Sequence, residues 1–135
     1  MGRENECDFR VIVADDERVI ADTLALILKG SGFNACAVYS GEQALGLARE
    51  WGADALISDF MMPGMNGIET AIAIRAIDPT CSIILFSGHG TLNTCRSAEE
   101  KGFEVLAKPV QPDRLLRWLQ NLRDRRCSEA DQRVT

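Results

Sequence analysis

Short, nearly uninterrupted apolar stretches alternate along the chain with segments in which apolar residues recur every three or four positions. The apolar stretches predict five strands, at residues 10–14, 35–39, 55–58, 82–87 and 103–107, and the first of them is rich in β-branched residues. The periodic segments predict five helices, at residues 17–30, 40–51, 68–77, 91–101 and 112–122. Strands that are apolar along their whole length are typical of a parallel sheet covered by helices on both faces. The pattern therefore predicts an α/β fold, a three-layer αβα sandwich with a doubly wound parallel sheet.

Helix boundaries carry recognisable signals. Ser40 followed by Gln43 fits a capping box and predicts the start of the second helix, and Pro112 suits the first turn of the last one. After Leu122 the apolar periodicity is lost, so we expect the last helix to end there and the remaining residues to form a frayed, solvated tail.

Charged and hydroxyl side chains follow four of the five predicted strands. They are Asp15 and Asp16 after the first, Asp59 after the third, Ser87 at the end of the fourth and Lys108 after the fifth. In a doubly wound sheet the carboxyl ends of the strands form the ligand site. Three neighbouring carboxylates would repel one another, by about 1 kcal/mol per pair at ~4 Å in water and roughly 4 kcal/mol at an effective dielectric of 20. Oxygen ligands of this kind suit Mg²⁺, or Mn²⁺ in its place.

A phosphoryl group on Asp59 would unite these residues in one chemistry. A carboxylate can accept a phosphoryl group as a nucleophile, and a metal ion and Lys108 would neutralise the charge in transfer while Ser87 donates a hydrogen bond. Taken singly, each signal has a plainer reading. Asp15-Asp16 is more often a helix cap, Lys108-Pro109 a strand terminator and Ser87 a turn residue.

Composition narrows the class of protein. The chain has 135 residues, enough for one domain, and a net charge of −5, which argues against direct nucleic-acid binding. No apolar run approaches the ~20 residues of a membrane helix, and the N-terminus lacks the apolar core of a signal peptide. We therefore expect a cytoplasmic protein without membrane contact. Its five cysteines have no metal-site or disulfide spacing and are expected to be reduced, with Cys36 and Cys81 as small core residues.

Four motifs in order resemble the receiver domain of bacterial two-component response regulators. They are VADDE with Asp15 and Asp16, SDFMMPGMNG with Asp59, FSGHG with Ser87, and AKP with Lys108. The resemblance covers residues 9–122 and implies a receiver domain there, with residues 1–8 and 123–135 as flexible termini. It also implies a flavodoxin-like sheet with strand order 2-1-3-4-5.

The resemblance further implies a role for each site residue. Asp59 would accept a phosphoryl group from a sensor histidine kinase or a phosphotransfer protein and would change contacts with a downstream effector protein. Asp15, Asp16 and Asp59 would bind Mg²⁺ together with the backbone carbonyl of Met61. Ser87 and Lys108 would meet the phosphoryl oxygens, the Lys108-Pro109 bond would be cis, and a homodimer is left open. Such a domain is no enzyme beyond its own phosphorylation and dephosphorylation.

The sequence departs from the family pattern near Lys108, in the part of the domain that would pass the signal to a partner. The family usually has Phe or Tyr three residues before the lysine, where this chain has Val105. The nearest aromatic residue is Phe103, for which we predict a place in the core. His89 and Met61 stand where family members tune the attack of water on the phosphoryl group, and from Met61 we expect slow to moderate dephosphorylation.

Three functional hypotheses follow. The first is the phosphorylation-dependent switch, and the second is a receiver-like interaction module that takes no phosphate. The third is an aspartate-nucleophile phosphatase of the haloacid dehalogenase type, which would want Asp-x-Asp after the first strand and a cap insertion, neither of which is present. The residues after Leu122 are too few for a DNA-binding module, so we expect a single-domain regulator acting through protein contacts or a piece of a longer chain.

Overall fold

The computed structural model describes residues 9–88, 92–109 and 111–134. Strands and helices alternate strictly along the chain, as the sequence pattern predicts. Their order is β1 (Arg10–Ala14), α1 (Arg18–Gly30), β2 (Asn34–Val38), α2 (Gly41–Trp51), β3 (Ala55–Asp59), α3 (Gly67–Ile77), β4 (Ser82–Ser87), α4 (Leu92–Glu100), β5 (Glu104–Ala107) and α5 (Pro112–Val134). The predicted bounds agree to within one residue everywhere except at the end of α5.

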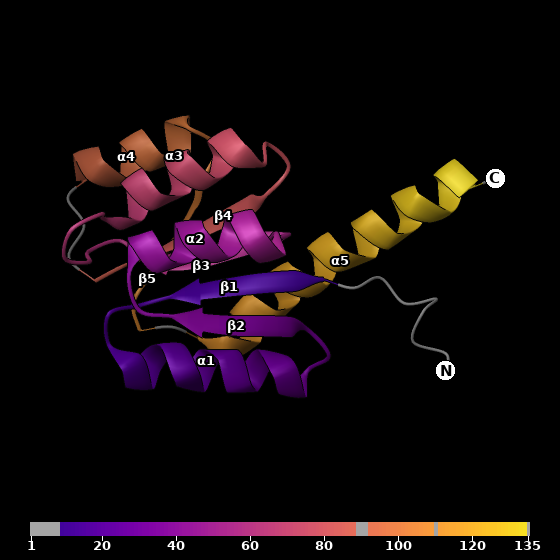
Figure 1. The fold of residues 1–135 in the computed structure, drawn as a ribbon, viewed down its shortest axis with the longest axis horizontal. Helices are drawn as coiled ribbons and strands as arrows, with labels where there is room; N and C mark the ends of the chain where they lie inside the picture. Colours follow the sequence, from indigo (N-terminus) through magenta and orange to yellow (C-terminus); the bar gives the residue numbers. More distant parts are fainter. Residues whose placement is uncertain (1–8, 89–91, 110, 135) are drawn as a thin grey trace.

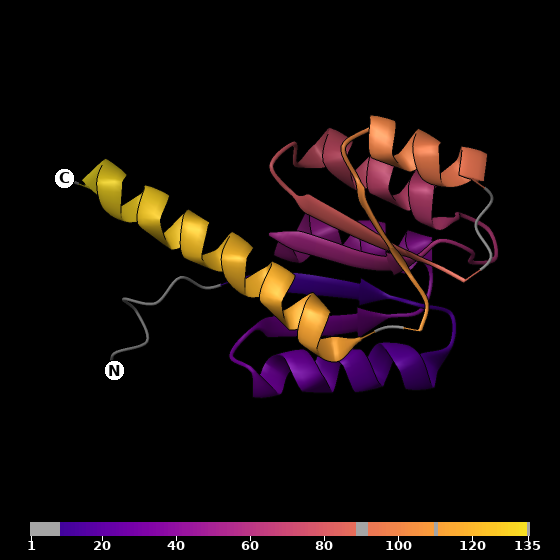
Figure 2. The same cartoon turned by 180° about the vertical axis from the view of Figure 1, so that it is seen from behind.

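The five strands form one parallel sheet with helices on both faces (Figure 1). Two separate apolar cores lie on its two sides. One core holds residues of α1 and α5, among them Leu24, Leu28 and Leu119, and the other holds residues of α2, α3 and α4, among them Ala44 and Ile74. Figure 2 shows the arrangement from behind. The fold is the predicted three-layer αβα sandwich.

The strand order is β2-β1-β3-β4-β5, which confirms the flavodoxin-like order expected for the sheet. The chain first runs outward from β1 to β2, then returns across β1 to build the other half. The strand order thus reverses between β1 and β3, and a doubly wound sheet opens its ligand crevice at this switch point. The register sets Ala14 beside Ser58 and Asp59 beside Phe86, so the residues after β1 and at the end of β3 meet there.

The start of α2 confirms half of the predicted capping box. The Ser40 hydroxyl accepts a hydrogen bond from the Gln43 N–H at 3.0 Å, as predicted. The Gln43 side chain accepts from the N–H of Tyr39 at 2.8 Å, one residue before the cap, instead of from Ser40 itself. A complete capping box occurs at α3, where Asn66 and Glu69 each accept from the other's backbone N–H at 2.9 Å.

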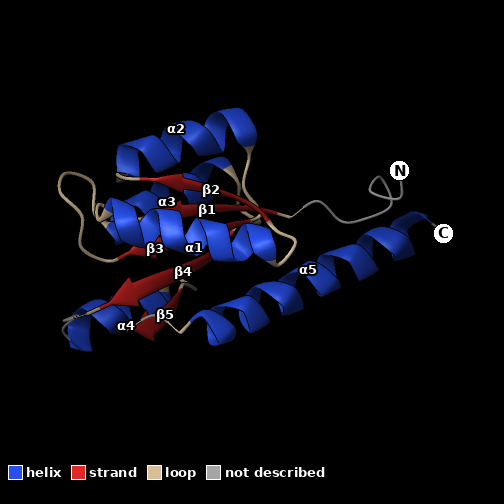
Figure 3. Cartoon of the chain, turned by 90° about the horizontal axis from the view of Figure 1, so that it is seen from below, coloured by secondary structure: helices blue, strands red, loops and turns tan. Residues whose placement is uncertain are grey.

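The predicted end of the last helix at Leu122 is wrong, because α5 continues to Val134. The segment after Leu122 contains neither proline nor glycine, so nothing interrupts the backbone hydrogen bonds even though the apolar stripe has ended. The C-terminal part of α5 projects beyond the sheet (Figures 1 and 3). Just after Leu122 the helix still contacts the domain, because the Arg123 guanidinium lies 4.4 Å from the centre of the Phe33 ring.

Two further expectations bear on the class of protein. Cys81 is a buried core residue, as predicted, whereas Cys36 is half-buried on β2, and neither forms a disulfide among the described residues. Within the part of the chain that the structure covers, no helix combines the length and the apolar character needed to cross a bilayer.

Gly67 at the start of α3 offers a test of how tightly the helix seats on β3. A Cβ atom at this position would fall far inside contact distance of the Asp59 carbonyl oxygen and 3.0 Å from the Phe60 Cα. We expect Gly67→Ala to lower the free energy of unfolding by about 1–3 kcal/mol, because backbone atoms must shift. Gly46→Ala is the control, since nothing lies within 4 Å of its Cβ position, and it should gain about 0.5–1 kcal/mol from helix propensity. Urea unfolding followed by circular dichroism measures both, and equal stabilities would contradict the tight seating.

Candidate functional site

Three carboxylates gather at the switch point of the sheet. Asp15 and Asp16 directly follow β1, and Asp59 is the last residue of β3. One carboxylate oxygen from each residue lies within 4.8 Å of the other two. The structure therefore brings together the three acidic residues that the sequence placed at separate strand ends, and it does so because β1 and β3 are direct neighbours in the sheet.

Asp15 is buried and held in one orientation. It is 4% exposed, and its Oδ1 accepts a hydrogen bond from the Glu17 N–H at 2.9 Å. The residue in the N-cap position of α1 is Glu17, which makes no side-chain cap, so the plainer helix-cap reading of the Asp15-Asp16 pair does not describe what is seen. Burial raises the pKa of the Asp15 carboxyl, and the negative charges of Asp59 and Asp16 add to this, while the Glu17 N–H and Lys108 act against it.

Lys108 supplies the positive charge of the site. Its Nζ lies 3.1 Å from Oδ2 of Asp59, which is 8% exposed. Backbone pairing places it there, because Ser87 pairs with Ala107 and the Lys108 N–H donates to the Ser87 carbonyl oxygen at 3.0 Å. The Ser87 side chain is buried at the end of β4. The Lys108-Pro109 peptide bond is cis, which confirms the expectation from the family resemblance.

The loop after Asp59 is anchored to its surroundings by backbone contacts. The Phe60 N–H donates to the Phe86 carbonyl at 2.9 Å, and the Gly67 N–H donates to the Phe60 carbonyl at 2.9 Å. Phe60 and Met62 bury their side chains, while Met61 between them is 74% exposed. The Met61 side chain therefore points to solvent between two buried neighbours.

The structure confirms the prediction that Phe103 is a core residue. Phe103 is buried in the core between the sheet and helices α2, α3 and α4, with the Arg75 guanidinium 5.5 Å from its ring centre. Val105 is half-buried and pairs with Leu85 of β4. His89, the second position expected to tune water attack, lies outside the described residues.

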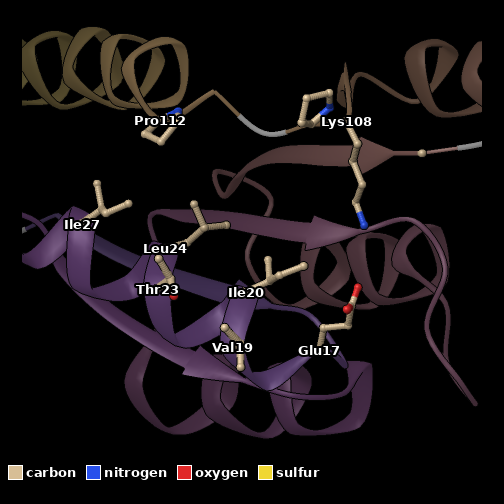
Figure 4. Close-up of a pocket in the computed structure, with 10 residues that line it drawn as sticks. Glu17, Val19, Ile20, Thr23, Leu24, Ile27, Lys108 and Pro112 are labelled. Carbon is tan, nitrogen blue, oxygen red and sulfur yellow. The ribbon is translucent and has the colours of Figure 1, made fainter.

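An apolar groove opens beside the charged residues (Figure 4). It has a volume of about 660 Å³ and runs between α1 and the segment that joins β5 to α5. Ile20, Leu24 and Ile27 of α1 line it, and Lys108 and Glu17 stand at its end near the carboxylates. Val19 of α1 also lines it and is 78% exposed, an unusual degree for a valine.

Sequence reasoning missed two features around the site. The groove was missed because the apolar residues of the segment 17–30 were used only to predict a helix, although that helix has more apolar residues than one buried face accommodates. The capping box of α3 was missed although Asn66-x-x-Glu69 has the required spacing. Both signals are present in the sequence.

The geometry defines a class of site. All candidate metal ligands here are carboxylate oxygens, a donor set that suits Mg²⁺ and gives softer metals little advantage. A lysine ammonium in contact with the central carboxylate provides a second cation. Such a site at the switch point of a flavodoxin-like sheet can receive an anionic group on Asp59 and neutralise it from two sides.

Comparison with known proteins identifies the family. Residues 11–120 match the sequence profile of the response regulator receiver domain. The chain is 32% identical over 107 residues to the DNA-binding response regulator MtrA of Mycobacterium tuberculosis, covering 79% of this chain and 47% of MtrA. It is 36% identical over 108 residues to a response regulator receiver protein of Anaeromyxobacter sp., covering 79% of this chain and 45% of that protein. The chain therefore belongs to the receiver domain family of two-component response regulators.

Solved structures agree with this assignment. A response regulator receiver domain from Clostridium thermocellum superposes with a TM-score of 0.81 at 28% identity, over 87% of this chain and 96% of that one. The chemotaxis protein CheY4 of Vibrio cholerae gives a TM-score of 0.77 at 26% identity, over 85% of this chain and 98% of that one. The chain spans less than half the length of the curated relatives described above.

The raised pKa of Asp15 gives a prediction about stability. A carboxyl whose pKa is higher in the folded than in the unfolded protein favours folding below the unfolded pKa, and this advantage is lost as the pH rises through the folded pKa. At neutral pH without metal, Asp15→Asn should therefore raise the free energy of unfolding by about 1 kcal/mol, because the neutral amide removes the cost of burying a charge beside Asp59 and Asp16. The gain should shrink below about pH 4, near the ordinary carboxyl pKa. Urea unfolding at both pH values measures it, and a gain that grows in acid would contradict the assigned cause.

Proposed function

We propose that this domain is a phosphorylation-dependent switch in which Asp59 accepts a phosphoryl group from a sensor histidine kinase or a phosphotransfer protein. Asp15, Asp16, Asp59 and the backbone carbonyl of Met61 would hold Mg²⁺, with Mn²⁺ as a substitute. Phosphorylation would then alter contacts with a downstream protein. The observation that carries the proposal is the meeting of three carboxylates within 4.8 Å with Lys108 Nζ 3.1 Å from Asp59.

The residues of the site have distinct parts in the transfer. An Asp59 carboxylate oxygen forms the new O–P bond while the P–N bond of the donor phosphohistidine breaks and leaves its electron pair on nitrogen. The donor imidazole keeps the proton on its other nitrogen and departs neutral. Bound Mg²⁺ would add positive charge beside the phosphoryl oxygens. Lys108 would pair with one of these oxygens, and the Ser87 hydroxyl would donate a hydrogen bond to another.

Burial supports Asp59 as the acceptor. Its carboxyl lies at the edge of the sheet with little freedom to turn away, and its neighbours exclude most water from it. A fixed nucleophile beside fixed cations needs little reorganisation during transfer. Asp16 is exposed and Asp15 is held by the Glu17 N–H, so both are better placed as metal ligands than as acceptors.

The apolar groove could serve as the surface on which the protein that donates the phosphoryl group docks. It ends at Lys108, so a protein that covers Val19 and Ile20 would bring a histidine side chain close to Asp59 (Figure 4). A helical donor with an apolar stripe would bury surface that α1 leaves exposed. The charge at the end of the groove and the apolar lining along it would then have separate tasks, chemistry and recognition.

The two competing hypotheses are not equally well supported. The family match leaves the haloacid dehalogenase hypothesis without support, because the chain belongs to a different family. The interaction module that takes no phosphate shares the fold, so it is separated from the proposal only by chemistry at Asp59.

Intact mass spectrometry tests the acceptor. The protein is incubated with acetyl phosphate and Mg²⁺, and one phosphoryl group should appear on the wild type because Asp59 is the nucleophile. Asp59→Asn should carry no adduct under the same conditions, since an amide does not attack phosphorus. Chelation of Mg²⁺ should suppress the wild-type adduct. A wild type that gains no mass and binds no beryllofluoride would leave the interaction module as the better hypothesis.

Substitution in the groove tests donor docking. Val19→Asp places a charge in the apolar lining and should slow transfer from a phosphorylated histidine phosphotransfer protein by roughly tenfold or more, the cost of about 1.4 kcal/mol in binding. Phosphorylation by acetyl phosphate should not change, because the small donor needs no groove. Ile77→Asp is the control, an exposed apolar position on α3 away from the groove. Equal rates for both variants would exclude this surface as the docking site.

A further inference from the structure

The loop that joins Asp59 to α3 has a firmly anchored base. As described above, Phe60 bonds to β4 through its N–H and to Gly67 through its carbonyl, and Met62 is buried in the core. Asn66 at the far end is fixed by the capping box of α3. Between these anchors lies the tip of the loop, residues 63–65, whose first two residues are exposed.

One hydrogen bond ties this tip to another element among the residues that the structure describes. The Met65 N–H donates to Oε2 of Glu42, in the first turn of α2, at 3.3 Å. Glu42 is far from Asp59 in sequence and is itself exposed, so it belongs to neither the metal ligands nor the core. It connects α2 to the loop that carries the Met61 carbonyl.

Two glycines permit this contact. A Cβ atom on Gly41 would clash with the Thr70 hydroxyl of α3 and lie 2.9 Å from the Met65 carbonyl oxygen, so only glycine lets α2 approach the loop this closely. Gly64 has a φ of 74° and presents its bare Cα side to Glu42, with its Cβ position 3.0 Å from Glu42 Oε2. The first turn of α2 therefore packs closely against the loop tip and places the Glu42 carboxylate beside it.

We propose that Glu42 is a positioning residue for the metal site, acting through the loop tip on the backbone carbonyl of Met61. This inference rests on the proposed function, which gives that carbonyl to Mg²⁺. The Met61 side chain is exposed and adds no packing of its own, so the direction of its peptide group depends on the segments on either side. Phe60 and Met62 restrain one part of the loop, and Glu42 restrains the tip. Restrained ligand groups bind a metal more tightly because less order is lost on binding.

A plainer role for Glu42 must be separated from this one. An acidic residue in the first turn also stabilises a helix through its charge at the positive end of the dipole. Glu42→Gln removes that charge but keeps an oxygen that can accept from the Met65 N–H, whereas Glu42→Ala removes both. Glu50→Ala removes the same charge from an exposed position at the other end of α2 and serves as the control.

The first measurement is amide hydrogen exchange by NMR in the metal-free protein. Glu42→Ala should speed exchange at the Met65 amide and broaden or shift the Met61 resonance, because the tip loses its restraint. Glu42→Gln and Glu50→Ala should retain the wild-type protection at Met65. Unchanged exchange in Glu42→Ala would overturn the proposed restraint, and thermal unfolding of all variants shows whether they fold equally well.

The second measurement is the Mg²⁺ affinity by calorimetry. Glu42→Ala should weaken Mg²⁺ binding roughly three- to tenfold, as expected for the loss of one hydrogen bond that orders a ligand, while phosphorylation at saturating Mg²⁺ is restored. Glu42→Gln should bind within about twofold of the wild type, because screened charge at this distance matters little. If Glu42→Gln is as weak as Glu42→Ala, the effect is charge alone and the positioning role is wrong.

The two proposals fail in different ways. A wild type that takes up no phosphoryl group from acetyl phosphate contradicts the proposed function, whatever Glu42 does. A wild type that is phosphorylated, together with a Glu42→Ala variant of unchanged Mg²⁺ affinity, contradicts only the positioning role.

Discussion

Electrostatic repulsion among Asp15, Asp16 and Asp59 is the constraint around which the rest of this structure is arranged. Parallel strands deliver their carboxyl ends to one edge of the sheet, so acidic residues that follow β1 and end β3 cannot avoid one another. Burial makes the charge of Asp15 costly and raises the pKa of its carboxyl. Lys108 offsets part of this cost at Asp59. The remainder is what makes the edge a receptive place for a cation.

The surroundings of the carboxylates divide into a rigid part and an adaptable one. The loop after Asp59 is held by β4, by the capping box of α3 and by the first turn of α2, so the segment that follows this carboxylate has a defined geometry. The α1 groove next to it is apolar and open. The charged residues and the apolar surface are therefore carried by different segments, the first by anchored strand ends and loops and the second by α1.

The edge strand β5 is connected to the site through backbone contacts with β4. Ser87 and Lys108 are linked by a main-chain hydrogen bond, and Val105 pairs with Leu85 two residues earlier. Phe103 lies in the core and stacks under Arg75, so the aromatic residue nearest the lysine has a packing role. Val105 thus stands in the paired strand β5 at the place where the family usually has an aromatic ring.

The sequence by itself determined the elements, the sheet type and which charged residues stand at the strand ends, because unbroken apolar strands and the charges at their ends are local patterns. Only the tertiary structure decided which strand ends meet, since that depends on β1 lying between β2 and β3. It also decided that Gln43 reaches Tyr39, that α5 continues past Leu122, and that Glu42 contacts Met65. These features depend on how far separate segments approach each other or on the absence of a stop signal. A periodic pattern records which face of an element is buried, but it does not record what lies opposite.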